Sequence, residues 1–188
     1  MKTQTKTINM EMSINENKNI SQQINKLFAN ENYDKAIELL TDNLKTYPYD
    51  HWLLAQLSIC YYELKNYDKA LEISNEAIKL SPNCPLTLDY RATILFANKN
   101  IDEAKNIWLN LLNINTNKLA NDACGEGVQF ALSLQNDIRF MLGDLYLELN
   151  DKTNALYYYK LHLEYRKRGL FSNYSKKEVL NEIKKLEK

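Results

Sequence analysis

The sequence contains few of the residues that interrupt regular secondary structure, with only 4 glycines and 3 prolines among 188 residues. Glycine and proline are the strongest local breakers of helices, so their scarcity indicates that helices dominate. With 45% apolar residues, the chain is long enough to bury a sizeable core. We therefore expect one domain, which we assign to residues 19–188.

The chain also lacks an excess of charge, because 24 Lys and Arg balance 24 Asp and Glu. The whole-chain field gives no reason to expect nucleic acid or an anionic membrane as a partner. The distribution is less even, because residues 151–188 hold ten basic against five acidic residues and the rest of the chain carries the opposite surplus. The basic surplus would orient an acidic partner, although lysines on solvated helix faces are its more common explanation.

Residues that carry enzyme chemistry are scarce. His51 and His162 are the only histidines, and the sequence contains no HExxH, CxxC or P-loop motif. The Gly-Glu-Gly segment at 125–127 lacks the lysine and the preceding apolar strand of a phosphate loop, so we interpret it as a helix start. An enzyme with Cys124 as nucleophile and His162 as base is the catalytic alternative. We predict no catalytic residue, no metal site and no cofactor.

The sequence has no long apolar run. The start, Met1–Lys6, is polar, and no later segment approaches the length of a membrane span. Cys60, Cys84 and Cys124 are odd in number and distant in sequence, which fits free thiols in a reducing compartment. We therefore expect a cytoplasmic protein.

The sequence does contain an internal repeat. Asn-Tyr-Asp-Lys-Ala occurs at 32–36 and again, unchanged, at 66–70. Pro48 and Pro82 have the same separation, so whole helix-turn-helix units recur with a period of about 34 residues. With the repeated alanine as anchor, three repeats follow, at residues 17–50, 51–84 and 85–118.

These features resemble the tetratricopeptide repeat, whose motif places small and large residues at set positions. In the second repeat the matching residues are Leu57, Tyr61, Ala70, Ala77 and Pro82, whereas Ser58 and Ser74 replace the preferred Gly and aromatic residue. Small residues let neighbouring helices approach, and large ones fill the gaps. The resemblance implies an all-α, right-handed superhelical stack of helix-turn-helix repeats.

A fourth repeat at residues 136–169 is out of phase, which leaves residues 119–135 as an insertion. Apolar residues continue at helical spacing after Gly127, and no further Gly or Pro occurs before Gly143. This pattern predicts one extended helix from about 127 to 149, roughly 35 Å long. Bracing of the fold is favoured over projection, because an apolar extension in solvent would be costly.

The two ends of the chain are expected to differ in structure. A capping-box pattern at 175–178 is followed by Val179, Leu180, Ile183 and Leu186 on one face, which predicts a capping helix over residues 174–187. Residues 1–18 are expected to be flexible, although residues 8–14 alternate apolar and polar in the way of a strand.

The resemblance also implies a binding site, because the first helix of each hairpin in this family lines a concave groove. Motif places assign this groove to Trp52, Gln56, Ile59 and Tyr62, then Leu86, Asp89, Tyr90 and Phe96, and finally Asp137, Phe140 and Asp144. Aromatic rings combine large contact area with little rotamer entropy, so they suit the anchoring of peptides. In the alternative interpretation, other parts of the chain cover some of these rings.

One known groove of the family grips a terminal carboxylate through Lys, Arg and Asn side chains. The corresponding places here hold Ser21, Asn25, Gln56, Leu86 and Tyr90, of which only one matches. Without the cations a carboxylate would be poorly compensated, so an apolar segment or amphipathic helix suits the groove better. The acidic residues at its far end favour a basic patch on that ligand.

We therefore predict a non-catalytic protein–protein interaction module that binds a peptide or amphipathic segment of another protein, with neither nucleic acid nor membrane as partner. The alternative is a dedicated bacterial chaperone or immunity-type protein for one secreted protein or toxin.

Overall fold

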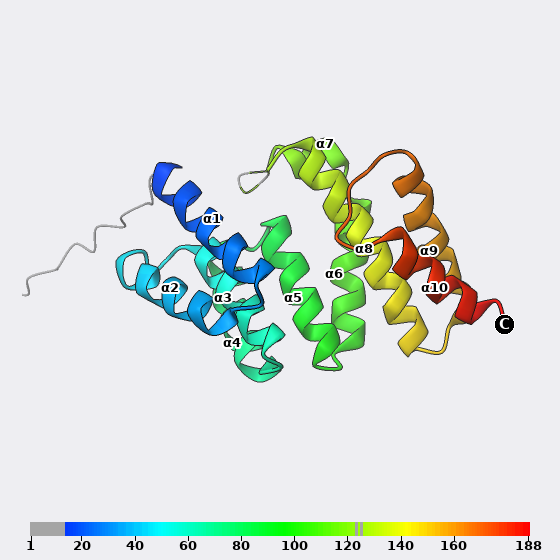
Figure 1. The fold of residues 1–188 in the computed structure, drawn as a ribbon, viewed down its shortest axis with the longest axis horizontal. Coiled ribbons are helices and arrows are strands. Elements are labelled where there is room, and N and C mark those ends of the chain that lie inside the picture. The colour runs from blue at the N-terminus through cyan, green and yellow to red at the C-terminus, as the bar shows by residue number, and fades with distance from the viewer. Residues whose placement is uncertain (1–13, 123, 125) are drawn as a thin grey trace, which may run out of the picture. The chain divides into compact units, whose positions relative to one another are not determined.

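The computed structural model describes residues 14–122, 124 and 126–188, and this part of the chain contains α-helices and no strand (Figure 1). The helices are α1 (Ile14–Ala29), α2 (Tyr33–Thr46), α3 (His51–Glu63), α4 (Tyr67–Leu80), α5 (Pro85–Ala97), α6 (Ile101–Asn113), α7 (Thr116–Ala120), α8 (Val128–Glu148), α9 (Lys152–Lys167) and α10 (Lys176–Leu186). The predicted all-α class is confirmed. None of the described helices is both long and apolar enough to cross a membrane.

The first helix begins earlier than the sequence predicted. Residues 1–13, with most of the strand-like alternation, lie outside the described residues, but α1 starts at Ile14 inside the segment expected to be flexible. Ile20 and Ile24 lie one turn apart and are 7% and 1% exposed. Near the start of α1, Glu16 accepts a hydrogen bond of 3.1 Å from the Tyr47 hydroxyl, at the end of α2. These contacts stabilise the first turns of α1, although the residues of its first turn are mostly polar.

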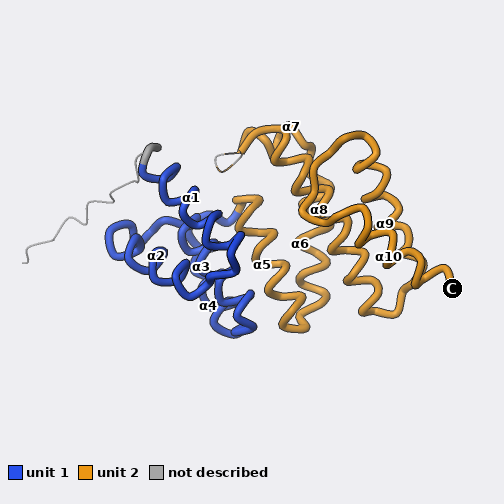
Figure 2. Tube along the Cα trace, viewed as in Figure 1, with its two compact units in different colours: residues 1–82 blue, residues 83–188 orange. Residues whose placement is uncertain are grey.

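The chain forms two compact units, residues 1–82 and residues 83–188 (Figure 2). Unit 1 contains the hairpins α1/α2 and α3/α4. Unit 2 contains the hairpins α5/α6 and α8/α9, together with α7 and α10.

The turn inside each hairpin has the same left-handed backbone. Glu31, Lys65, Lys99 and Asn150 all have a positive φ, between 52° and 64°. The first three follow one another at equal intervals, and the fourth comes later by the length of the insertion expected at 119–135. Five positions after each of these turns stands an alanine that is 0% exposed, at 36, 70, 104 and 155. The same turn and the same small residue therefore recur in all four hairpins.

The predicted extended helix is confirmed as α8, which has 21 residues and a length of about 32 Å. Its first turns pack against α7 and α6. The Gln135 side chain joins these elements, because its Nε2 donates to the Ile114 carbonyl at 2.9 Å and its Oε1 accepts from the Thr116 hydroxyl at 2.8 Å. The extension thus braces unit 2.

The second half of α8 packs against α9 and comes especially close to it at Gly143. A Cβ atom at Gly143 would lie within 2.9 Å of three atoms of the Tyr159 ring, and that ring is 0% exposed. Only glycine leaves room for the ring at this crossing.

The predicted capping helix is confirmed as α10. The capping box is formed, with the Glu178 N–H donating to Ser175 Oγ and the Ser175 N–H donating to the Glu178 carboxylate. Val179 and Ile183 are buried, but Leu180, which the sequence placed on the same face, is 43% exposed. The buried face of α10, which packs against α9, is therefore narrower than predicted.

Candidate functional site

Unit 2 contains a pocket of about 440 Å³ between the first helices of its two hairpins. Its walls come from three segments: α5, the first half of α8, and the loop between α9 and α10. The lining residues are Leu86, Asp89 and Tyr90, then Gln129, Phe130, Ser133, Leu134 and Asp137, and finally Phe171 and Asn173.

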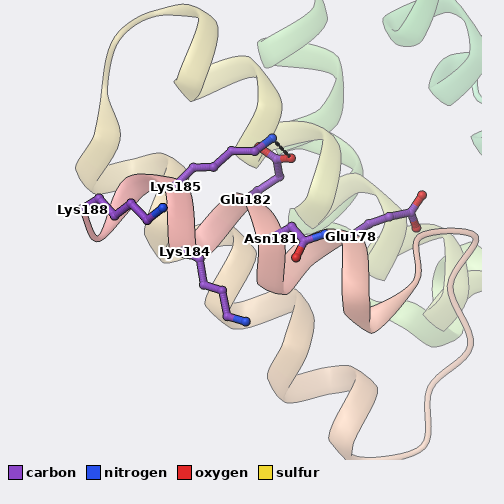
Figure 3. Close-up of a pocket in the computed structure, with 6 residues that line it drawn as sticks. All are labelled: Glu178, Asn181, Glu182, Lys184, Lys185 and Lys188. Atoms are coloured by element: carbon purple, nitrogen blue, oxygen red, sulfur yellow. Dashed lines mark hydrogen bonds and ion pairs between the residues drawn. The ribbon is translucent and has the colours of Figure 1, made fainter.

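Two other hollows are less suited to a ligand. One, of about 390 Å³, is lined only by side chains of α10 and its end, including Lys184, Lys185 and Lys188, so a single convex helix forms it (Figure 3). The other, of about 380 Å³, lies between α1 and α2 in unit 1 and has mostly polar walls. Neither combines apolar walls with convergent polar groups, as ligand pockets usually do.

The structure brings four of the predicted groove residues together in the unit 2 pocket: Leu86, Asp89, Tyr90 and Asp137. The sequence interpretation missed Gln129, Phe130, Ser133 and Leu134, because it assigned them to an insertion. They continue the face of Asp137 backwards along α8 at helical spacing, and that spacing was the available signal. For Phe171 and Asn173, in a loop beyond the last hairpin, no periodic signal existed.

The other predicted residues of unit 2 lie away from the pocket. Phe96 packs edge-on against the Trp108 ring, with centroids 5.8 Å apart. Phe140 is 8% exposed, and Tyr174 stacks on it with ring centroids 3.9 Å apart. Asp144 accepts a hydrogen bond from the Tyr159 hydroxyl, and burial raises the pKa of Asp144 to about 6. The loop and α10 thus cover this part of the predicted groove.

The remaining four predicted residues lie on α3 in unit 1. Gln56 and Ile59 are 7% and 9% exposed, whereas Trp52 and Tyr62 are half-buried. The Tyr62 ring packs against Tyr67, with ring centroids 5.8 Å apart.

Two carboxyl groups stand in the walls of the pocket. Trp108 Nε1 donates to Asp89 Oδ1 at 2.9 Å, while Asp89 Oδ2 accepts no hydrogen bond from the described residues. Burial raises the pKa of Asp89 to about 7, and the nearby charge of Asp137 acts in the same direction. Asp89 therefore binds a proton more readily than an exposed aspartate does.

Asp137 also holds the loop that forms one wall. It accepts hydrogen bonds from the Ser172 hydroxyl, the Asn173 N–H at 3.1 Å and the Asn173 side-chain amide at 2.8 Å. Burial raises the pKa of Asp137, while these bonds and the charge of Arg166 oppose the rise. The loop is thereby fixed to α8.

Ser172, His162 and Asp137 meet in this region but not in the order of a catalytic triad. The serine hydroxyl donates to Asp137, so it is His162 Nε2 that donates to Ser172 Oγ, at 2.9 Å. A triad needs the reverse, with the histidine accepting the serine proton and the aspartate on its other nitrogen. His162 Nδ1 is buried and has no hydrogen-bond partner among the described residues. These contacts hold the loop after α9 against α8 and α9, and we refer to Asp137, His162 and Ser172 together as the latch.

None of the three cysteines lines the unit 2 pocket: Cys60 belongs to unit 1, and Cys84 and Cys124 belong to unit 2. Cys60, Cys84 and Cys124 form no disulfide within the described residues, and the Sγ atoms of Cys84 and Cys124 lie within 4.8 Å of each other. Burial raises the pKa of Cys84 to about 11. His162, the proposed base for Cys124, is 0% exposed and bonded to Ser172, and burial lowers its pKa to about 4.

The C-terminal lysines lie on exposed surfaces. Figure 3 shows Lys184 and Lys185 on α10 and Lys188 after its end. Lys185 Nζ lies 2.6 Å from a carboxylate oxygen of Glu182. This arrangement is that of a solvated helix face rich in lysine.

Known proteins share this architecture. Sequence models of the tetratricopeptide repeat match residues 27–88 and 137–167. The fold is similar to a human IFIT1 dimer with PPP-AAAA, at 20% identity and a TM-score of 0.64, over 87% of this chain but only 37% of that one. It is also similar to MamA, at 17% identity and a TM-score of 0.51 over 94% of both chains. A MamA RS-1 ArsTM double mutant has 15% identity and a TM-score of 0.55, over 90% of this chain and 93% of that one.

These likenesses concern the fold, and no curated protein matches the sequence. Together with the four equivalent hairpins, the two family matches show that this chain is a tetratricopeptide repeat protein.

Proposed function

We propose that this chain is a non-catalytic protein-interaction module, and that the unit 2 pocket holds a segment of a partner protein. Helical-repeat proteins bind on the surfaces that their first helices create, and the pocket lies between two such helices. The observation that carries the proposal is the aromatic wall of this pocket. Phe171 is 66% exposed at its edge, next to the half-buried Phe130 and Tyr90.

An exposed phenylalanine is costly to leave in water beside other apolar side chains, so such a patch commonly marks an interaction site. The pocket walls are also well supported. Both helices belong to packed hairpins, and the Asp137 contacts fix the loop that carries Phe171. A preorganised wall loses little entropy when a segment binds.

In unit 1 we propose Trp52 and Tyr62 of α3 as further contacts, because both rings are partly exposed. Gln56 and Ile59 are buried, so their contribution to a contact with a partner would be smaller.

A double substitution in the pocket tests the proposal. Phe130→Ala with Phe171→Ala removes both rings, and we expect at least a tenfold loss of affinity for a partner identified by affinity capture and then purified. Tyr157→Ala is the matched control, because Tyr157 is 57% exposed on α9 and does not line the pocket. Circular dichroism would verify that all variants remain folded. Unchanged affinity of the double variant would refute the proposed site.

A further inference from the structure

The pocket combines carboxyl groups with apolar walls. Two carboxyl groups, Asp89 and Asp137, contribute to its surface, and none of the described residues that line it is Lys, Arg or His. The cation acting on Asp137 is Arg166 on α9, whose Nη1 donates to the Leu170 carbonyl at 2.9 Å. Arg166 therefore holds the loop from outside the pocket.

The two carboxyl groups differ in how many of their oxygens already accept a hydrogen bond from the protein. Asp137 is engaged by Ser172 and Asn173 through both of its oxygens. Asp89 uses one oxygen for the buried Trp108 indole, and its Oδ2 accepts no hydrogen bond from the part of the chain that the structure describes. Asp89 itself is partly exposed and lines the pocket. Its second oxygen is therefore the acceptor that the pocket offers to a ligand donor.

The rest of the wall suits a long, flexible stem. Phe130, Leu134 and Phe171 provide apolar and aromatic surface beside the carboxyl groups. Lys and Arg bury their methylene stems along apolar surface while the charged end stays with a polar partner, and aromatic faces attract the same cations. A purely apolar ligand would instead cover the carboxyl groups without compensating them, and an anion would be repelled.

We propose that the pocket recognises a basic side chain, Lys or Arg, of the bound segment, with its cation at Asp89 and Asp137 and its stem against Phe130 and Phe171. This proposal rests on the proposed function of the same pocket, and adds the chemistry of the residue that enters it. Charge complementarity then selects the partner, while the aromatic rings provide contact area.

Short peptides provide the probe, since the natural partner is unidentified. Acetylated and amidated Ala-Arg-Ala and Ala-Lys-Ala are titrated into the isotope-labelled full chain and followed by amide NMR shifts. Ala-citrulline-Ala and Ala-norleucine-Ala are the neutral controls, because each preserves the shape of the stem without the charge. We expect shifts at residues 86–90, 129–137 and 171–173, with at least tenfold weaker binding of both neutral peptides.

Two aspartate variants distinguish the loss of a charge in the pocket from a general effect on folding. Asp89→Asn keeps an oxygen acceptor for Trp108 but loses the charge, so we expect it to weaken binding of the basic peptides about tenfold. Asp144→Asn is the matched control, because Asp144 is another carboxyl group of unit 2 with a burial-raised pKa and an aromatic donor, but lies outside the pocket.

Three results would overturn the inference: equal binding of arginine and citrulline peptides, unchanged binding by Asp89→Asn, or shifts confined to another surface such as α10. Absence of binding by every peptide would also count against it. In each case the capture experiment with the Phe130 and Phe171 variants still decides the proposed function independently.

Discussion

Two aromatic residues of unit 2, Trp108 and Tyr159, each stand one turn after the buried alanine of their hairpin, yet the surfaces beside them differ. Each ring is 0% exposed and donates a hydrogen bond to an aspartate on the preceding first helix, Asp89 or Asp144. Asp89 faces an open pocket, whereas Asp144 lies within the electrostatic reach of Glu182 and Lys185 on α10.

The difference between the two hairpins arises from the chain that follows α9. The loop after α9, hydrogen-bonded to Asp137, and the Tyr174 ring stacked on Phe140 bury one part of the predicted groove. The neighbouring part, beside α5, remains open as the pocket. Equivalent hairpins therefore acquire different roles through what covers them. Four experiments test this contrast.

The largest effect is expected from the two phenylalanines of α8. Phe140→Ala removes a ring packed against Tyr159, His162 and Tyr174, and should lower the free energy of unfolding by about 3–4 kcal/mol. Phe130→Ala, at the half-buried pocket wall, should cost about 1 kcal/mol or less. Urea unfolding followed by circular dichroism measures both. Similar losses in the two variants would contradict the contrast between covered and open parts.

A smaller loss is expected where α8 and α9 cross. Gly143→Ala places a methyl group against the Tyr159 ring and should destabilise the protein by about 2 kcal/mol, because that ring is fully buried and its hydroxyl is hydrogen-bonded to Asp144. The control is a double-mutant cycle with Tyr159→Leu, which removes the obstructing ring. In that background the alanine should cost much less; full additivity would show that the close approach is not the cause.

The latch at His162 predicts a pH dependence. Burial lowers the folded-state pKa of His162 to about 4, below its ordinary value of about 6.5, so the unfolded chain binds a proton first as pH falls. Its contribution to stability is thus complete above pH ~6.5 and declines as pH falls toward 4, by ~2 kcal/mol between pH 7.5 and 5.

Comparison with His162→Gln isolates this contribution, because Asp89 and Asp144 titrate in both proteins and act in the opposite direction. The difference in unfolding free energy between wild type and variant should shrink on acidification. A difference that stays constant from pH 7.5 to 5 would show that His162 is not held neutral.

The smallest effect concerns the left-handed turns. Lys65 has φ 60°, and its equivalent Asn150 has φ 59°. Asparagine tolerates this backbone better than lysine, so Lys65→Asn should stabilise by about 0.5 kcal/mol and Asn150→Lys should destabilise by a similar amount. Thermal unfolding of the pair measures both, and changes of the same sign would contradict the equivalence of the two turns.

Much of the fold was predictable, because local patterns carry it. Ala36, Ala70 and Ala104 marked the helix crossings, and the spacing beyond Gly127 predicted the length of α8. The lining of the pocket was predictable only in part. Motif places identified Asp89, Tyr90 and Asp137 as a group, but Phe171 and Asn173 come from a loop without periodicity.

By itself, the sequence determined the helical hairpins, their repeat period and the C-terminal cap, since each depends on patterns within a few turns of the chain. Only the tertiary structure decided which part of the predicted groove is open. Tyr174 and Asn173 belong to the loop after α9, whereas their partners Phe140 and Asp137 lie on α8, with the whole of α9 between them in sequence. Contacts over such separations arise from the path of the folded chain, and no local pattern of side chains encodes that path.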